Sequence, residues 1–192
     1  MSNHHPASRT MPRARKVILT AILIALTIVL QRLLAFRTPI IQINFMFVPI
    51  MLAGMLLGWP GATFVATVAD LIGAILFPSG SFFFGYTLTA ILTGFTTGIR
   101  LYRPDGVKLD RNFVIRLVLC ILIITGVLNG GLNTIWVLMM TGDASNIIVP
   151  VRIVKQLVMA PIMLLTMLAL VKIFAPRLNR LLGVERDQTQ TV

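Results

Sequence analysis

The chain has 192 residues, of which 57% are hydrophobic and 12% are charged, and its mean hydropathy is +0.91. This composition excludes an ordinary water-soluble domain, which needs more polar surface to cover its core. The net charge of +11 does not indicate nucleic-acid binding, because the basic residues lie in short clusters between long apolar runs. The single cysteine, Cys120, lies inside an apolar run and excludes a disulfide framework and a cysteine metal site, so we expect a buried small hydrophobic residue there.

Six apolar stretches are long enough to cross a bilayer as helices, because about 20 helical residues span its core of about 30 Å. In chain order they cover about 17–34, 40–57, 62–77, 86–99, 113–140 and 147–174. A Gly-Trp-Pro-Gly turn at residues 58–61 separates the second stretch from the third. We therefore expect an all-α integral membrane protein with six transmembrane helices. Its predicted parts are a disordered basic cytoplasmic tail at 1–16, one membrane domain at 17–176 and a polar cytoplasmic tail at 177–192.

The basic residues predict the orientation of these helices. With the N-terminus inside, 13 of the 17 Lys and Arg lie in cytoplasmic segments. We therefore expect a multi-pass membrane protein with both termini in the cytoplasm. The four basic residues left toward the outside are Arg32, Arg37, Arg152 and Lys155.

These outer basic residues outnumber the acidic residues that could neutralise their charge. Only Asp70 and Asp143 are expected on the same side of the membrane. Because charges inside a membrane persist when they face protein, a water-filled cavity or an opposite charge, the surplus predicts a positive cavity for an anionic ligand. The alternative is that the long side chains extend to lipid headgroups.

Polar residues recur at this depth on the fifth and sixth predicted helices. Asn129, Asn133 and Trp136 follow i, i+4, i+7 spacing and so share one helix face. Arg152 and Lys155 lie in the outer part of the sixth stretch. We expect these faces to form a ligand pocket open to the outside, although an Asn in a membrane helix can instead bridge two helices.

The loop between the third and fourth stretches is uncharged and aromatic. It reads Phe-Pro-Ser-Gly-Ser-Phe-Phe-Phe-Gly-Tyr-Thr-Leu-Thr-Ala over residues 77–90. Pro78, Gly80 and Gly85 are turn-forming residues, and the aromatic side chains are suited to cover a planar ring. The alternative is an aromatic belt at the membrane interface.

This loop resembles the outer loop of the folate-specific S components, the substrate-binding subunits of energy-coupling factor (ECF) vitamin transporters. Those proteins carry Phe-Pro-x-Gly-x-(aromatic)-Phe-x-Gly-(aromatic)-Thr-Leu-Thr-Ala at the corresponding place. Phe84 departs from the pattern, because the family often has Pro there, which affects the shape expected for the loop. Segments 43–45 (Ile-Asn-Phe) and 133–136 (Asn-Thr-Ile-Trp) are also similar to the family.

The resemblance implies a transport function with partners. Ala21 and Ala25 match the Ala-x-x-x-Ala motif with which S components dock on a transmembrane coupling subunit. Small residues at this spacing also occur in ordinary helix packing. The family implies folate as the transported ligand, a coupling subunit and two cytoplasmic ATPases. It also implies a location in the plasma membrane of a prokaryote. The chain has no G-x-x-x-x-G-K-[ST] phosphate loop, so ATP would be hydrolysed by those partners, and we expect no cofactor, catalytic residue or metal in this chain.

Folate combines a flat pterin with a benzoyl-glutamate that carries two carboxylates. We expect Asp70, Asn129 and Asn133 at the pterin edge, and Arg152 and Lys155 at the glutamate. The complete set of predicted ligand-binding residues is Arg32, Asp70, Phe77, Pro78, Gly80, Phe84, Tyr86, Thr87, Asn129, Asn133, Trp136, Arg152 and Lys155.

For Arg32 the ligand-binding role conflicts with the predicted docking face. Arg32 follows Ala21 by eleven residues, so the two side chains share nearly the same helix face unless the helix bends or ends there.

Other functions remain open at this level. An S component for pantothenate or thiamine is the nearest alternative, although thiamine is cationic and pantothenate lacks a flat ring. An intramembrane enzyme would need a reactive set at one depth, whereas the histidines, His4 and His5, both lie in the N-terminal tail. A self-sufficient secondary transporter or a structural membrane protein is the third alternative.

Overall fold

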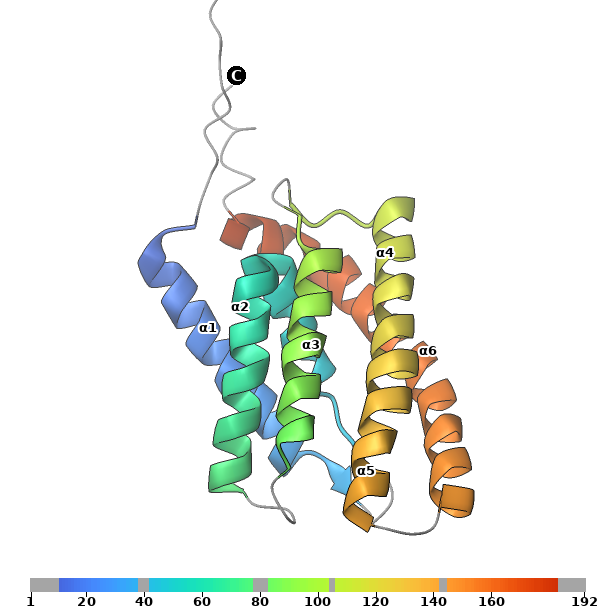
Figure 1. Cartoon of the computed structure of the whole chain (residues 1–192). Coiled ribbons are helices and arrows are strands. Elements are labelled where there is room, and N and C mark those ends of the chain that lie inside the picture. The colour runs from blue at the N-terminus through green and yellow to red at the C-terminus, as the bar shows by residue number, and fades with distance from the viewer. Residues whose placement is uncertain (1–10, 38–41, 78–82, 104–105, 142–144, 183–192) are drawn as a thin grey trace, which may run out of the picture.

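The structure is a computed structural model, and it describes residues 11–37, 42–77, 83–103, 106–141 and 145–182. In chain order the elements are α1 (Arg13–Ile28), η1 (Val29–Leu33), β1 (Phe36–Arg37), β2 (Gln42–Ile43), α2 (Phe47–Leu76), α3 (Phe84–Leu101), α4 (Arg111–Leu122), η2 (Ile123–Leu132), α5 (Asn133–Thr141) and α6 (Ser145–Leu182). The elements η1 and η2 are π-helical, and each directly continues the α-helix before it. Figure 1 shows the helices side by side, with the start of α1, the start of α4 and the end of α6 at one end of the bundle.

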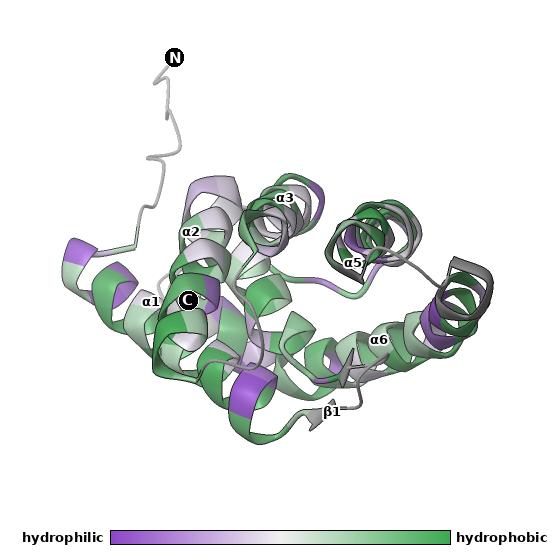
Figure 2. Cartoon of the chain, turned by 60° about the horizontal axis from the view of Figure 1, so that its bottom comes forward, coloured by the Kyte–Doolittle hydropathy of each residue, from purple (hydrophilic) through white to green (hydrophobic). Residues whose placement is uncertain are grey.

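The described helices have the composition of membrane helices. Four of them are long and apolar enough to cross a bilayer, at Arg13–Leu33, Phe47–Leu76, Arg111–Met140 and Val149–Asn179. Hydrophobic residues cover most of the length of α1, α5 and α6, with hydrophilic residues in short stretches (Figure 2). The chain is therefore a helical membrane protein, as its composition predicts.

Helix α2 is broken at Gly58 into two limbs, which run in opposite directions (Figure 1). Gly58 has φ 72° and ψ −169°, a conformation that glycine adopts at little cost, and a Cβ added there would lie 3.4 Å from Tyr102 Cδ2. Pro60 lies in the first turn of the second limb, where a missing backbone N–H breaks no hydrogen bond. The break that the sequence predicts here is confirmed, but it lies at Gly58 alone, because residues 59–61 are already helical.

The second limb of α2 packs closely on α3 because small residues line the contact. A Cβ added at Gly94 would lie 2.6 Å from the backbone oxygen of Ala62, and one at Gly98 would overlap the backbone of Trp59. Small residues four apart let membrane helices approach to backbone contact, where dispersion forces hold them. This contact fixes where α3 begins and therefore where its first turn presents side chains.

Between the first limb of α2 and helices α4 and α6 lies the larger apolar core. Met51, Met55, Leu117 and Met167 are fully buried in it. Cys120 belongs to the same core as a buried free thiol, as expected for a small hydrophobic residue.

The connection between α1 and α2 differs from the prediction. We expected a helix over 40–57, but α2 begins only at Phe47, and β2 pairs antiparallel with β1 through Phe36↔Ile43 and Arg37↔Gln42. The backbone N–H of Met46 donates to Asn44 Oδ1 at 3.3 Å, a local bond that competes with helix formation. This strand pair is an exception to the all-α prediction within the described part of the chain.

Both ends of the helical region extend into the segments predicted as tails. Helix α1 already includes Arg13–Lys16, and α6 continues past Pro176 to Leu182. Asn179 on this extension makes two hydrogen bonds with the backbone of Val107, in which Val107 N–H donates at 2.7 Å and Asn179 Nδ2 donates to the carbonyl at 3.2 Å. The end of α6 is thus attached to the connection between α3 and α4. Residues 1–10 and 183–192 lie outside the described residues.

Asp110 caps the N-terminus of α4 and provides a pH-dependent contribution to stability. Its Oδ1 accepts from Phe113 N–H and from Arg103 Nη1, both at 2.9 Å, and the hydrogen bond from Arg103 is the main cause of its lowered pKa. A carboxyl with a lowered folded-state pKa stabilises the fold above its usual pKa, and this contribution is lost as pH falls through the lowered value. We expect the melting temperature of the wild-type protein in detergent to fall more than that of Asp110→Asn between about pH 6 and about pH 3. Parallel pH profiles for the two proteins would contradict this.

Candidate functional site

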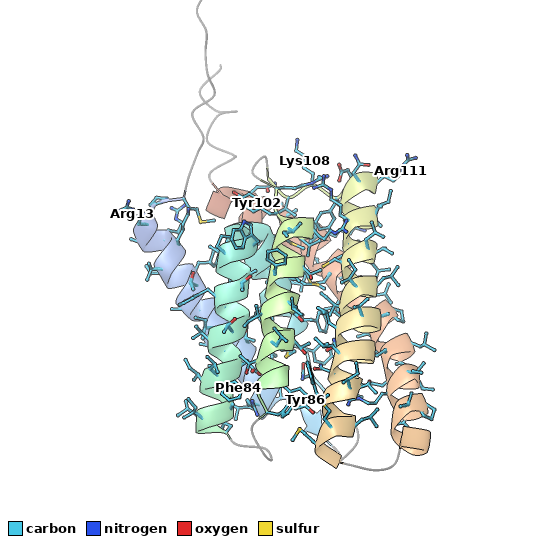
Figure 3. All side chains as sticks on the ribbon, viewed as in Figure 1. Arg13, Phe84, Tyr86, Tyr102, Lys108 and Arg111 are labelled. Atoms are coloured by element: carbon cyan, nitrogen blue, oxygen red, sulfur yellow. The ribbon has the colours of Figure 1, made fainter. Side chains whose placement is uncertain are left out.

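Tyr86 lies at the end of the bundle opposite Arg13, Lys108 and Arg111 (Figure 3). Aromatic and cationic side chains from α3, α5 and α6 lie near it. We call Phe83, Tyr86, Trp136, Asn133, Arg152 and Lys155 the aromatic–cationic cluster. They come from the start of α3, from α5 and from α6.

The aromatic side of the cluster is held by ring contacts. The Phe83 ring lies 5.6 Å from that of Trp136 at 52°, and 6.2 Å from that of Tyr86 at 76°. Trp136 Nε1–H donates to Thr89 Oγ1 at 3.2 Å, which orients the indole against α3. The three rings therefore form one preorganised aromatic surface between α3 and α5.

Gly85 is buried beneath two of these rings, which gives a stability prediction. A Cβ at this position would lie 2.5 Å from Phe83 Cε1 and from Trp136 Cδ2, closer than real carbon contacts allow. We expect Gly85→Ala to force the rings apart and to destabilise the protein by about 1–3 kcal/mol. Thermal unfolding in detergent measures this, with Gly126→Ala as the control because a Cβ there meets nothing within 4 Å. Equal melting temperatures for the two variants would contradict it.

The cationic side of the cluster is directed toward protein rather than lipid. Arg152 Nη1 donates to the backbone oxygen of Asn133 at 3.1 Å, and both Arg152 and Lys155 are half-buried. The two positive charges are close enough to repel each other, and Arg152 is also within electrostatic reach of Tyr86. Within the part of the chain that the structure describes, neither cation has an acidic partner, while Asp143 lies outside that part. The cluster is thus suited to receive an anion.

Next to these cations, buried oxygens lack hydrogen-bond partners. Asn133 Nδ2 donates to Asn129 Oδ1 at 2.8 Å, so the two amides bond along one helical run instead of bridging two helices. Asn133 Oδ1 and Thr134 Oγ1 are buried and have no hydrogen-bond partner among the described residues. An unsatisfied buried polar group costs about 1–3 kcal/mol, which a bound molecule with N–H donors would offset. The π-helical segment η2 that precedes them is a backbone feature frequent at functional sites.

A second polar group lies between α1, α2 and α3. The carboxylate of Asp70 is 8% exposed and accepts from Gln31 Nε2 at 3.3 Å and from Thr87 Oγ1 at 2.9 Å. Arg32 Nη1 donates to the backbone oxygen of Phe77 at 3.2 Å. Gln31 and Arg32 both lie in η1, and this π-helical turn changes the helix phase, which resolves the conflict between Arg32 and the docking face.

A comparison with protein families identifies the chain. A family model described as "ECF transporter, substrate-specific component" matches residues 15–173. The chain belongs to this family. It is therefore a component of a membrane transporter and not an enzyme, in agreement with the resemblance found in the loop.

Individual relatives agree with the family. The chain is 36% identical over 153 residues to a protein named folate transporter FolT from Clostridium novyi (strain NT), covering 79% of this chain and 85% of the relative. It is 34% identical over 155 residues to a FolT from Leuconostoc mesenteroides subsp. mesenteroides, covering 77% and 80%. Among solved structures, the crystal structure of FolT bound with folic acid matches with a TM-score of 0.71 and 31% identity, covering 80% of this chain and 89% of that one.

The S-component structure distributes the predicted ligand-binding residues unevenly. Asn133, Trp136, Arg152 and Lys155 come together with Tyr86, whereas Arg32, Asp70 and Thr87 form the second polar group. Phe84 is 77% exposed and Phe77 is 40% exposed, and it is Phe83 that packs on Trp136. Pro78 and Gly80 lie outside the described residues, as does the side chain of Arg37.

Four residues that belong to these two groups or lie beside them were missed by the sequence reasoning: Gln31, Phe83, Thr89 and Thr134. Phe83, Tyr86 and Thr89 are spaced by three, so they share a face once the start of α3 is known. That start was predicted at residue 86, which placed Phe83 in the loop. Nothing in the local sequence indicates Gln31, because its role depends on a partner 39 positions away.

The predicted docking residues lie on an open face of the S component. Leu23 and Thr27 are buried where α1 packs on the rest of the bundle, while Ala21 and Ala25 are exposed together with Ile22. Docking through this face stays a prediction.

Proposed function

We propose that this S component captures folate at the aromatic–cationic cluster and delivers it to an ECF importer. The observation that carries the proposal is the fold shared with FolT bound with folic acid, at 31% identity over 80% of this chain. The two relatives named folate transporters support the same ligand.

The chemistry of the cluster fits the two ends of folate. The pterin is flat and carries N–H donors, which suit the rings of Tyr86 and Trp136 and the unsatisfied oxygen of Asn133. The glutamate carries two carboxylates, which suit Arg152 and Lys155. Thiamine is cationic and would add positive charge beside these two residues, so it fits less well.

The proposed topology has six spans with both termini in the cytoplasm. Because Gly58 reverses α2, its two limbs cross in opposite directions, and these limbs join α1–η1, α3, α4–η2–α5 and α6 to give the six. The end of the bundle that carries Lys108 and Arg111 is then cytoplasmic by the positive-inside rule, and the aromatic–cationic cluster faces the outside.

Partners would supply the energy. We propose that a transmembrane coupling subunit contacts the exposed Ala21 and Ala25 face, and that two cytoplasmic ATPases drive release inside. The family of substrate-specific components supports this assignment, and the chain carries no phosphate-binding loop of its own.

Isothermal titration calorimetry of the purified protein with folate, thiamine and pantothenate tests the ligand. We expect saturable heat with folate and none with the other two at the same concentrations. Binding of pantothenate or thiamine with no binding of folate would replace the proposal with an S component for that vitamin.

A further inference from the structure

The second polar group is built around Asp70, a carboxylate that the membrane environment makes costly. A buried ionised group is tolerated only when hydrogen bonds or opposite charge compensate its lost hydration. Both oxygens of Asp70 accept from protein donors, Gln31 on η1 and Thr87 on α3. Arg32 lies against Gly73, one helical turn from Asp70 on the same face of α2, and brings positive charge to this side. The protein itself therefore satisfies the carboxylate.

This network fixes both sides of the loop that joins α2 to α3. Arg32 holds the backbone oxygen of Phe77 directly before the loop, and Asp70 holds Thr87 in the first turn after it. Gln31, which bonds to Asp70, lies in η1 beside Arg32, so α1–η1, α2 and α3 are joined at this point. The start of α3 is thereby attached to α1 and α2 by side-chain bonds in addition to its packing.

The residue next to Thr87 belongs to the aromatic–cationic cluster. Tyr86 contacts Phe83, and Phe83 contacts Trp136 on α5, so a rotation of the first turn of α3 would shift Tyr86 and Phe83 relative to the ring of Trp136. The hydroxyl of Thr87 is buried and donates to Asp70, which opposes such a rotation.

We propose that Asp70 is a positioning residue, which holds the first turn of α3 through Thr87 and so orients Tyr86 for the ligand without touching the ligand itself. This inference rests on the proposed function for the identity of the ligand. It replaces a pterin contact of Asp70 with a structural role that exists before any ligand binds.

Fluorescence of the ligand-free protein tests the positioning role directly. In a Trp59→Phe background, Trp136 is the remaining tryptophan. We expect Thr87→Val and Asp70→Asn each to shift Trp136 emission and to raise its quenching by acrylamide. Thr87→Ser keeps the hydroxyl and is expected to match the parent protein. Thr97→Val is the matched control, because the hydroxyl of Thr97 is buried on the same helix and donates to the carbonyl of Gly94 at 2.8 Å. Unchanged Trp136 fluorescence in both Thr87→Val and Asp70→Asn would overturn the proposal.

Folate titration of the same proteins supplies the second measurement. We expect Thr87→Val to weaken folate binding about tenfold. In the Thr87→Val background we expect Asp70→Asn to add no comparable loss, because both changes remove the same constraint, the bond between Thr87 and Asp70. A full further loss in the double variant would show that Asp70 contacts the ligand and would overturn the proposal. Failure of the parent protein to bind folate would count against the proposed function, while the fluorescence measurement would still decide the role of Asp70. Thr87→Val keeps the Asp70 carboxylate in place, so this variant still tests the proposal if Asp70→Asn does not fold.

Discussion

Ala25→Trp is expected to abolish folate uptake in cells that contain the partner subunits, while the purified variant binds folate as the wild type does. Ala25 is exposed on α1, whereas Leu23 and Thr27 make the buried contacts of that helix, so the larger side chain disturbs no internal packing. A small-residue face permits close helix approach, and a bulky side chain in its centre separates the two backbones. Uptake of labelled folate and calorimetry on the purified protein measure the two halves of this prediction.

Ala169→Trp is the matched control for this experiment. Ala169 is also exposed on a membrane helix, but it belongs to α6 and not to α1. We expect this variant to retain uptake, which separates a blocked docking face from a general effect of an added tryptophan on insertion. Wild-type uptake in Ala25→Trp, or an equal loss in both variants, would show that the α1 face is not the docking surface.

Arg152→Ala is expected to weaken folate binding by about tenfold to hundredfold, and to leave binding of a pterin fragment without glutamate within about threefold. The reason is that the guanidinium is half-buried, is held by the backbone oxygen of Asn133 and has no acidic partner among the described residues, so a ligand carboxylate would be its natural counter-ion. Parallel calorimetric titrations with folate and with the fragment give the two affinities.

Arg177→Ala serves as the control for charge, because Arg177 is exposed at the opposite end of α6 and stacks over Phe174. We expect it to change neither affinity. Equal losses for folate and for the fragment in Arg152→Ala would remove Arg152 from the glutamate site and assign it a role in the fold.

Much of the membrane architecture could be predicted from the sequence. The long apolar runs predict the helices α1, α4–η2–α5 and α6, because burial of backbone in lipid requires continuous internal hydrogen bonding. The reversal at Gly58 was visible as a Gly-Trp-Pro-Gly turn. The aromatic loop indicated the family that the comparison confirms.

Other features depend on contacts between distant segments and were not predictable in this way. Hydropathy favoured a helix over 40–57, yet the start of α2 was decided by the pairing of β1 with β2 and by the bond from Met46 to Asn44. Asp70 looked like a free acid available to a ligand, and only the fold showed that Gln31 and Thr87 already bond to it. A linear pattern cannot show such partners, because they lie 39 and 17 positions away.

The sequence alone determined that this chain lies in a membrane and where most of its helices run, and it predicted an anionic, flat ligand. Hydropathy and charge are properties of each segment by itself, so they can be assessed from the sequence without the tertiary structure. Only the tertiary structure decided that Phe83 rather than Phe84 meets Trp136, that Arg152 points at α5 and that Asp70 is held by protein. Those outcomes depend on the phase of each helix relative to its neighbours, which the π-helical turns η1 and η2 shift by amounts that spacing in the sequence does not show.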